Sequence, residues 1–385
     1  MKRISLIAIM ALMGIGSVAA KSSTTLPIVG EVVKATNPLI QYVGRVSFAK
    51  NETASFNFPG TSIFARFQGS SLKMICRPMT GYFMAQVDGC EPFKVGFNAE
   101  RDSVVTVAAA LPKGEHQVKL MYVIEGLFRT PEFRGFVLDK GCSLVKSPDL
   151  PERKIEFIGN SITCGYGVES IEMTDPFEDE TENHWLTYAN IVSDSLNAQH
   201  TSISRSGIGV YRNYDGPKAG SDENMPWQYE YTLFNKHDEK WDFNKYQPQL
   251  VCINLGTNDL STNNYDIAHY EKNYRMFLTT VRSKYPNAKI VLITGPMLGE
   301  KESGEQREVL DRICSDANKK GFTLPEEVRK ARKGKNKGDK DIYRFDFTFQ
   351  TGDLGYGASW HPSKLQHQKM ADELLPFLRN LMGWE

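Results

Sequence analysis

The chain has 385 residues, enough for two domains, and its 46 Lys and Arg balance 46 Asp and Glu. A net charge of zero gives no electrostatic basis for nucleic-acid binding, so no nucleic-acid partner is expected. The six cysteines are too few for a disulfide scaffold, and none has the Cys-x-x-Cys spacing of a zinc site. Cys76 and Cys90 lie on neighbouring strand-like segments and are a possible disulfide pair.

The N-terminus has the features of a secretory signal peptide, which we assign to residues 1–20. Lys2-Arg3 precede an apolar run over Ile4–Ile15, and small residues follow up to Ala20, after which we expect cleavage. The apolar run is too short for a membrane anchor, and no later stretch is long enough to span a membrane. We therefore expect an exported protein that is periplasmic, on the cell surface or secreted.

Short alternating apolar and polar runs, separated by turn residues, occupy the segment Leu39–Val145. Examples are Ile63–Phe67, Leu72–Cys76 and Gln117–Val123. Many short strands at a spacing of roughly 8–12 residues, without a helical period, predict an all-β sandwich, with a jelly roll as the favoured form. We assign residues 21–148 to this domain.

A short connector, Ser147–Pro151, contains two prolines, and the pattern changes after it. Residues 149–385 alternate strand-like and helical segments, which predicts a flavodoxin-like α/β domain with a mostly parallel sheet and helices on both faces. The expected strands are Lys154–Ile158, Gln199–Ser204, Leu250–Asn254, Lys289–Thr294 and Ile342–Phe347, and the expected helices are Trp185–Leu196, Tyr270–Val281, Glu305–Asn318 and Ser363–Leu381 with a kink at Pro376.

A serine follows the first expected strand of the α/β domain. Gly159 ends that strand, and Asn160-Ser161 occupy the turn after it. Open α/β sheets place reactive groups at the carboxyl ends of their strands, and such a turn can present Oγ beside its own N–H, as acyl transfer requires. Ser161 is therefore a candidate nucleophile, although an ordinary loop is the alternative for this stretch alone.

Three more polar stretches follow expected strands or precede the last helix. Gly207 would let its backbone N–H approach a ligand closely, or would simply form a turn. Asn258 could donate its side-chain amide to an oxyanion, or could cap the next helix together with Asp259. His361, in Trp-His-Pro, could act as a general base near neutral pH, or could only pack there.

In order, the blocks Gly-Asn-Ser, Ser-x-Gly, Gly-Thr-Asn-Asp and Trp-His-Pro resemble those of the SGNH (GDSL-type) hydrolases. The longer stretch Gly-Asn-Ser-Ile-Thr-Cys-Gly-Tyr-Gly, behind a β-sandwich, resembles more narrowly carbohydrate esterase family two, whose members are deacetylases with a jelly-roll domain ahead of the SGNH domain. The resemblance implies that Ser161 is the nucleophile and His361 the base. It also implies an oxyanion hole formed by the N–H groups of Ser161 and Gly207 and the side-chain amide of Asn258, without a metal or cofactor.

Two positions depart from the family pattern. Asn160 stands where the first block usually has aspartate, and it keeps an acceptor oxygen, so we expect the turn to survive. Ala358 stands three residues before the histidine, where SGNH triads carry aspartate, and the nearest upstream carboxylate is Asp353. We therefore expect a Ser–His dyad in which a backbone carbonyl on Nδ1 fixes the tautomer.

The resemblance suggests that the substrate is an acetylated carbohydrate, such as xylan, mannan or their oligosaccharides. The predicted substrate-binding residues are Trp360, Tyr166 and Asp259, with ordinary packing as the alternative for each aromatic ring. One rival function is a non-catalytic glycan-binding protein, which only Ala358 favours. Another is an esterase for a different ester, either a peptidoglycan O-acetyl group or a lipid. The pattern leaves open the oligomeric state. The sandwich either binds glycan itself or only walls the site, and we favour the second role.

Overall fold

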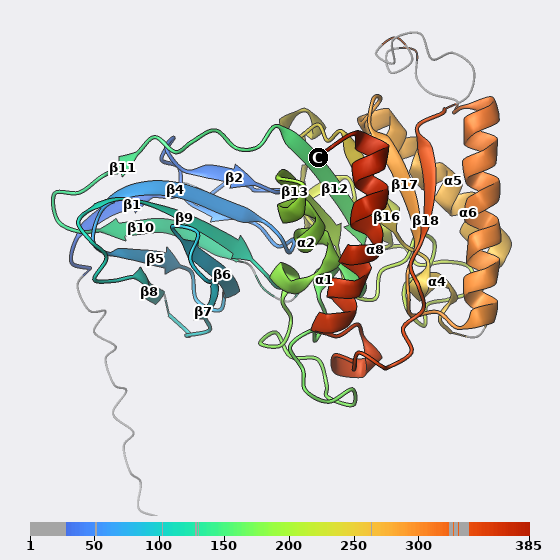
Figure 1. The fold of residues 1–385 in the computed structure, drawn as a ribbon, viewed down its shortest axis with the longest axis horizontal. Coiled ribbons are helices and arrows are strands. Elements are labelled where there is room, and N and C mark those ends of the chain that lie inside the picture. The colour runs from blue at the N-terminus through green and yellow to red at the C-terminus, as the bar shows by residue number, and fades with distance from the viewer. Residues whose placement is uncertain are drawn as a thin grey trace, which may run out of the picture.

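The computed structural model describes residues 28–385 except 51, 102, 128, 130, 263, 323–325, 327–329 and 331–338. An all-β domain and an α/β domain lie side by side (Figure 1). The predicted signal peptide falls outside the described residues. Among the residues that are described, no helix is long and apolar enough to cross a membrane.

The all-β domain is a sandwich of two antiparallel sheets, as predicted. The first sheet contains β1 (Glu31–Lys34), β3 (Ala54–Ser55), β5 (Leu72–Cys76), β8 (Ser103–Ala108) and β10 (Glu132–Leu138). The second contains β2 (Gln41–Val43), β4 (Ser62–Gly69), β6 (Gly81–Val87), β7 (Phe93–Phe97), β9 (Gly114–Tyr122) and β11 (Leu144–Val145). Alternate residues of β4, Ile63, Ala65 and Phe67, point into a shared apolar core, which explains the period of two in the sequence.

The α/β domain is built on a five-stranded parallel sheet with the order β13-β12-β16-β17-β18. Its strands are β12 (Arg153–Gly159), β13 (Ala198–Ser204), β16 (Leu250–Asn254), β17 (Lys289–Thr294) and β18 (Ile342–Asp346). Numbered along the chain the order is 2-1-3-4-5, the flavodoxin-like arrangement, and it reverses direction between β12 and β16. Ligands of such sheets bind outside the carboxyl ends of the strands at this reversal.

Helices cover both faces of this sheet, as predicted. One face packs against α2 (Tyr188–Ser195) and α8 (Lys364–Met382), and the other against α5 (Ile267–Lys284) and α6 (Glu300–Lys320). The helix expected over Trp185–Leu196 is divided, because Thr187 is extended between the 3-10 helix η1 (His184–Leu186) and α2. Pro376 lies inside α8, which runs as one helix. The smaller elements are α1 (Ser161–Cys164), α3 (Met225–Gln228), α4 (Thr257–Leu260), β14 (Tyr231–Leu233), β15 (Lys236–Lys240), η2 (Phe243–Lys245) and η3 (Ala358–Trp360).

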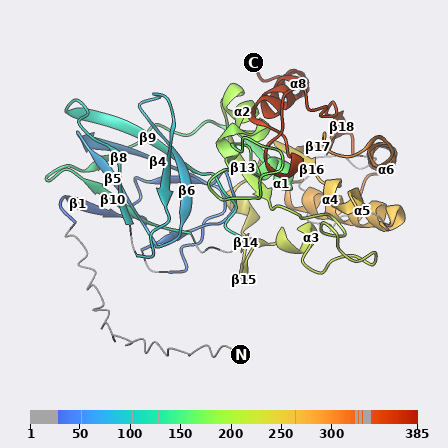
Figure 2. The ribbon, with the colours of Figure 1, turned by 90° about the horizontal axis from the view of Figure 1, so that it is seen from below.

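The two domains share part of their core. Val43 and Phe58 of the sandwich pack within the apolar cluster of the α/β domain. The buried guanidinium of Arg45 donates through Nη1 to the carbonyls of Tyr229 at 2.6 Å and Tyr231 at 2.7 Å, and it lies 5.0 Å from the centre of the Tyr229 ring. In both ribbon views the sandwich faces the end of the α/β domain that carries β13 and α2 (Figure 2).

The possible Cys76–Cys90 disulfide is not formed. Cys76 is buried in β5, whereas Cys90 is exposed after β6, and the structure does not join them. The reason is topological: β5 belongs to the first sheet of the sandwich and β6 to the second. Segments that are close in the sequence therefore lie in different layers.

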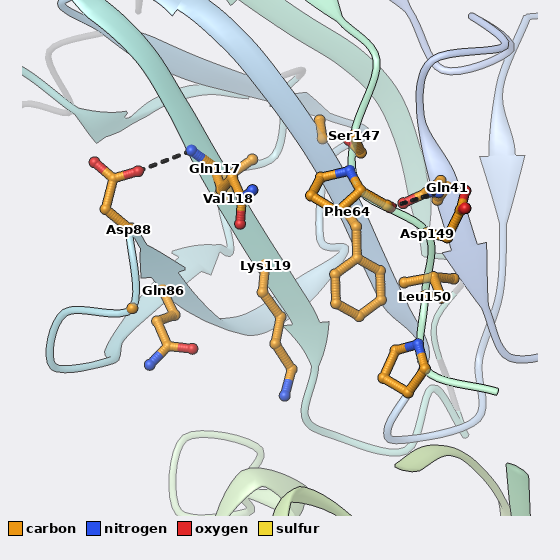
Figure 3. Close-up of a pocket in the computed structure, with 14 residues that line it drawn as sticks. Gln41, Phe64, Gln86, Asp88, Gln117, Val118, Lys119, Ser147, Asp149 and Leu150 are labelled. Carbon is orange, nitrogen blue, oxygen red and sulfur yellow. Dashed lines mark hydrogen bonds between the residues drawn. The ribbon is translucent and has the colours of Figure 1, made fainter. Parts of the chain in front are cut away.

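A surface groove of about 300 Å³ lies on the sandwich beside the connector (Figure 3). Phe64 and the glutamines Gln41, Gln86 and Gln117 are among the residues that line it. Two of the three glutamine amides are engaged within the protein, because Gln41 donates to Pro148 O at 3.2 Å and Gln86 donates to Cys90 O at 3.0 Å. That the sandwich mainly walls the active site thus stays our prediction.

Candidate active site

Ser161 begins the short helix α1 immediately after β12. Asn160 is the N-cap, and its Oδ1 accepts a hydrogen bond from the N–H of Ile162 at 3.0 Å. Gly159 allows the tight turn, because a Cβ at this position would lie 2.1 Å from Oγ1 of Thr163. The asparagine in place of the family aspartate thus supplies the acceptor oxygen that the turn requires.

His361 meets Ser161 from a loop 200 residues further along the chain. Its Nε2 lies 2.9 Å from Ser161 Oγ. On the other side of the ring, Nδ1 lies 3.0 Å from the carbonyl oxygen of Ala358 and 3.2 Å from that of Ser359. A carbonyl only accepts hydrogen bonds, so Nδ1 carries the proton and Nε2 presents its lone pair to the serine.

An unusual backbone turn brings these carbonyls to the imidazole. Ser359 and Trp360 are both left-handed, with φ of 50° and 58°. Such conformations cost of order 1–3 kcal/mol each for residues other than glycine and persist where the surrounding structure imposes them. Here Gln350 Nε2 donates to Trp360 O at 2.8 Å, and the N–H of Gly357 donates to His361 O at 2.8 Å.

The environment of His361 favours its neutral form. The ring of Tyr166 stacks on the imidazole with centroids 4.1 Å apart, and it also stacks on Phe177 at 4.5 Å. The protein packed around the imidazole removes most of its hydration and lowers the pKa of His361 to about 4. Asp353 does not take the part of a triad carboxylate, because it is exposed and accepts from Thr351 Oγ1 at 2.9 Å.

The other two predicted oxyanion donors follow the strands on either side of β12. Gly159 at the end of β12 is in register with Ser204 of β13 and with Asn254 of β16. Gly207 comes three residues after Ser204 and is left-handed, with φ of +74°. Asn258 is buried, and its Nδ2 donates to Ile208 O at 2.8 Å, which ties it to the loop of Gly207 and leaves its second N–H for a ligand. The three predicted donors thus follow adjacent strand ends, at the reversal of the sheet.

Asp259 was predicted to bind substrate, and this prediction is wrong. Its side chain is fully buried, and its carboxylate accepts from the N–H groups of Val210, Tyr211 and Arg212 at 2.8–3.2 Å. Burial raises the pKa of Asp259 to about 6 despite these bonds. The residue therefore shapes the segment after Gly207 and cannot touch a substrate.

Comparison with known proteins identifies the family. A model described as the N-terminal domain of carbohydrate esterase 2 matches residues 42–148, and a model of GDSL-like lipases and acylhydrolases matches residues 155–374. A family two carbohydrate esterase from Clostridium thermocellum, solved in complex with cellohexaose, is 34% identical, with 90% of this chain and 100% of that chain covered and a TM-score of 0.79. This chain belongs to carbohydrate esterase family two.

Two curated enzymes are also similar to this family two esterase. The cellulase/esterase CelE of Acetivibrio thermocellus is 34% identical over 90% of this chain, which spans only 40% of that longer protein. An acetylxylan esterase/glucomannan deacetylase of Cellvibrio japonicus is 27% identical, with 91% of each chain covered. A solved family two esterase from Cellvibrio japonicus, 25% identical, covers 92% of this chain and 98% of its own, with a TM-score of 0.78.

Two aromatic side chains of this family two esterase are exposed beside the predicted catalytic groups. Trp360, next to His361, is 52% exposed, and Tyr214 is 61% exposed. The N–H of Tyr214 donates to Gly207 O at 2.7 Å, so this residue lies beside a predicted oxyanion donor. Sequence reasoning missed Tyr214, because it lies in a polar loop without periodicity and in none of the four blocks.

Proposed function

We propose that this chain is a serine esterase that removes O-acetyl groups from carbohydrate through a Ser161–His361 dyad. The observation that supports this most directly is the 2.9 Å contact between Ser161 Oγ and His361 Nε2, with Nδ1 held by backbone carbonyls. Family membership supports the same conclusion. The carbonyls serve the orienting role that a carboxylate has in a triad, although they supply no negative charge to the imidazolium.

The mechanism follows from these positions. Ser161 Oγ attacks the acetyl carbonyl carbon while His361 Nε2 takes its proton. The N–H groups of Ser161 and Gly207 and the amide of Asn258 stabilise the negative charge that develops on the carbonyl oxygen. The bond to the sugar oxygen then breaks as His361 protonates that oxygen, which leaves an acetyl-serine. A water molecule, deprotonated by His361, attacks this ester and releases acetate and the free serine.

The surroundings of the dyad suit a sugar better than a long acyl chain. Trp360 and Tyr214 offer exposed rings on which a pyranose face can stack. One relative is named an acetylxylan esterase/glucomannan deacetylase, and another was solved in complex with cellohexaose. We therefore propose a β-linked plant-type polysaccharide or oligosaccharide as the acetylated substrate of this chain.

The test is acetate release from acetylated xylan, acetylated glucomannan and 4-nitrophenyl acetate by wild type and Ser161→Ala. We expect release by the wild type that vanishes in the variant, and the ranking of the polymers identifies the substrate. Absence of release from all three, by folded wild-type protein, would contradict the proposal. If that protein still bound the glycans, the non-catalytic binding function would replace it.

A further inference from the structure

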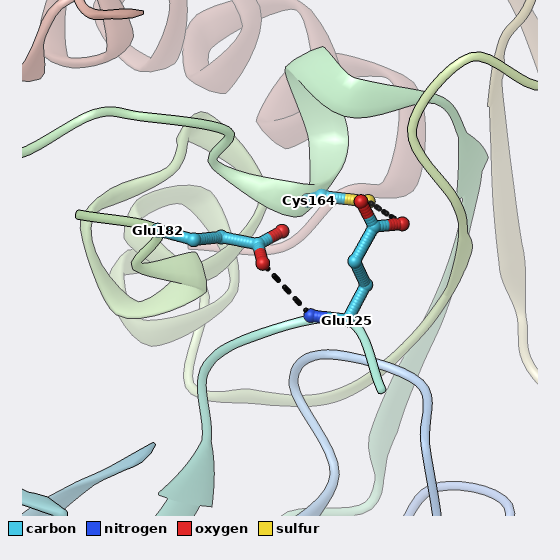
Figure 4. A group of neighbouring side chains, drawn as sticks. All are labelled: Glu125, Cys164 and Glu182. Carbon is cyan, nitrogen blue, oxygen red and sulfur yellow. Dashed lines mark hydrogen bonds between the residues drawn. The ribbon is translucent and has the colours of Figure 1, made fainter. Parts of the chain in front are cut away.

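A group of buried titratable side chains lies behind the helix that carries Ser161. Glu125 follows β9 of the sandwich, Cys164 is the last residue of α1, and Glu182 precedes η1. One oxygen or sulfur atom of each lies within 4.8 Å of the others, and all three side chains are buried. Figure 4 shows the two glutamates pointing toward one another beside Cys164.

Glu125 connects the sandwich to the loop of Gly207. Its Oε2 accepts from the backbone N–H of Ser206 at 2.6 Å, and its own N–H donates to Glu182 Oε2 at 3.0 Å. Cys164 Sγ lies 3.3 Å from Ser204 Oγ, at the start of the same loop. A residue of the all-β domain therefore contacts the loop of the α/β domain directly.

The contact is one residue away from a predicted oxyanion donor. The N–H of Gly207 and the carbonyl of Ser206 form one planar peptide unit. The position of Ser206 therefore sets the direction of that N–H. Glu125 holds Ser206 at its N–H, and Tyr214 N donates to Gly207 O at 2.7 Å on the other side. Ser206 and Gly207 are thus held on both sides, by the sandwich residue Glu125 on one side and by Tyr214 on the other.

We propose that Glu125 is a positioning residue through which the sandwich sets the geometry of the oxyanion hole. This inference rests on the proposed esterase function. It gives the sandwich a part in the reaction without contact to the substrate, because the carboxylate of Glu125 acts through Ser206 on the N–H of Gly207. Preorganised donors lower the barrier only when they point at the developing charge, so their direction matters for the rate.

The charges in the group fit this role. Burial raises the pKa of both glutamates, and that of Glu182 the more, because the neighbouring Glu125 and Asp179 add repulsion that Lys94 offsets only in part. For Glu125 the N–H of Ser206 and the nearby Arg205 favour the charged form. The surroundings therefore favour the charged form at Glu125 over Glu182, and a charged acceptor binds the N–H of Ser206 more strongly.

A matched pair of variants, Glu125→Met and Glu125→Gln, tests the inference with 4-nitrophenyl acetate. Both side chains have about the length of glutamate, but only Gln offers an oxygen that can accept from the N–H of Ser206. We expect Glu125→Met to lower kcat by roughly 10²-fold at a nearly unchanged KM, because a misplaced donor is felt in the transition state. Glu125→Gln should recover most of this loss.

A boronic acid that forms a tetrahedral adduct with the serine supplies a second readout. Its affinity should fall in Glu125→Met by about the same factor as kcat, since both depend on the oxyanion donors. The control is Glu132→Gln, at a buried sandwich glutamate bound by Lys50 and Arg77. This control should lower the melting temperature without changing kcat.

Equal kcat values in folded wild type and Glu125→Met would overturn the inference. So would a loss of kcat without a matching loss of boronate affinity, because the effect would then lie outside the oxyanion hole. A stoichiometric metal ion in the purified wild type, whose removal abolishes turnover, would make the three side chains a metal site instead. An inactive wild type would contradict the proposed function itself. The comparison of variants tests only the role of Glu125.

Discussion

The two halves of the candidate active site are held in different ways. The serine half consists of residues that follow three adjacent strands, and the sheet itself fixes their spacing. The histidine half is a single loop, 350–363, whose shape comes from its own backbone contacts and from two left-handed residues other than glycine. The proposed nucleophile is thus placed by the core of the domain, and the proposed base is placed by a local turn.

Because of this difference, changes far from the site can affect the serine half, whereas only nearby changes affect the histidine half. A change in the sheet or in its contact with the sandwich reaches Ser161, Gly207 and Asn258 through packed elements. A change in the histidine loop acts locally, on the imidazole and on the neighbouring Trp360, because Nδ1 is bound by carbonyls that are two and three residues away in the chain. Substitutions in the two halves should therefore differ in size and in kind.

The largest effect is expected when the serine or the histidine of the proposed dyad is removed. His361→Ala and Ser161→Ala should each lower kcat by at least roughly 10⁴-fold, and the double variant should be no worse than the more damaging single one, because the two groups act as a unit. Steady-state kinetics with 4-nitrophenyl acetate measure this. Additive losses in the double variant would show that the two residues act independently.

A smaller effect is expected from the serine half alone. Asn258→Ala should lower kcat by roughly 10²- to 10³-fold while KM changes little, since an oxyanion donor acts in the transition state. Asn273→Ala is the control, because this half-buried asparagine of α5 donates to His269 O within its own helix. A rise in KM with an unchanged kcat would contradict an oxyanion role.

A still smaller effect is expected from the histidine loop. Ser359→Val places a β-branched residue at φ of 50°, which costs about 1–2 kcal/mol, and the resulting shift of the loop should lower kcat roughly tenfold. Ser359→Gly tolerates this φ and should keep the wild-type rate. Equal rates for the valine and glycine variants would mean that the left-handed turn does not control the imidazole.

The smallest expected effect is on the pH profile. His361 must be neutral to accept a proton, and its pKa is lowered to about 4, so kcat/KM should stay level down to about pH 5 and fall only near pH 4. The unfolded chain binds this proton near pH 6.5, and the free energy of unfolding should therefore decrease as the pH drops from about 6.5 toward 4. An acid limb near pH 6.5 would show an imidazole exposed to water.

Much of the fold could be predicted because its signals are local. The strands Leu250–Asn254 and Lys289–Thr294 match the prediction, since a buried parallel strand is a continuous apolar run. The serine and histidine blocks were found in the same way, as short patterns at strand ends and before a helix. Such patterns identify a residue when its position depends on the residues next to it in the sequence.

The remaining features depend on contacts between distant segments. The role of Asp259 was predicted wrongly, because a motif does not show that its carboxylate turns inward to the N–H groups of residues 210–212. The possible Cys76–Cys90 pair does not form, because segments adjacent in the sequence lie in different sheets. Glu125 had no signal at all, since its partner Ser206 is 81 residues away in the other domain.

The shared core at the junction has a consequence for protein engineering. Val43, Phe58 and the guanidinium of Arg45 fill the α/β domain from outside its own sequence. A chain truncated to the second domain would expose that apolar surface and leave the carbonyls of Tyr229 and Tyr231 without their donor. The hydrolase half is therefore not a portable module, and any graft onto another scaffold, or fusion with a foreign binding domain, has to transfer both domains together.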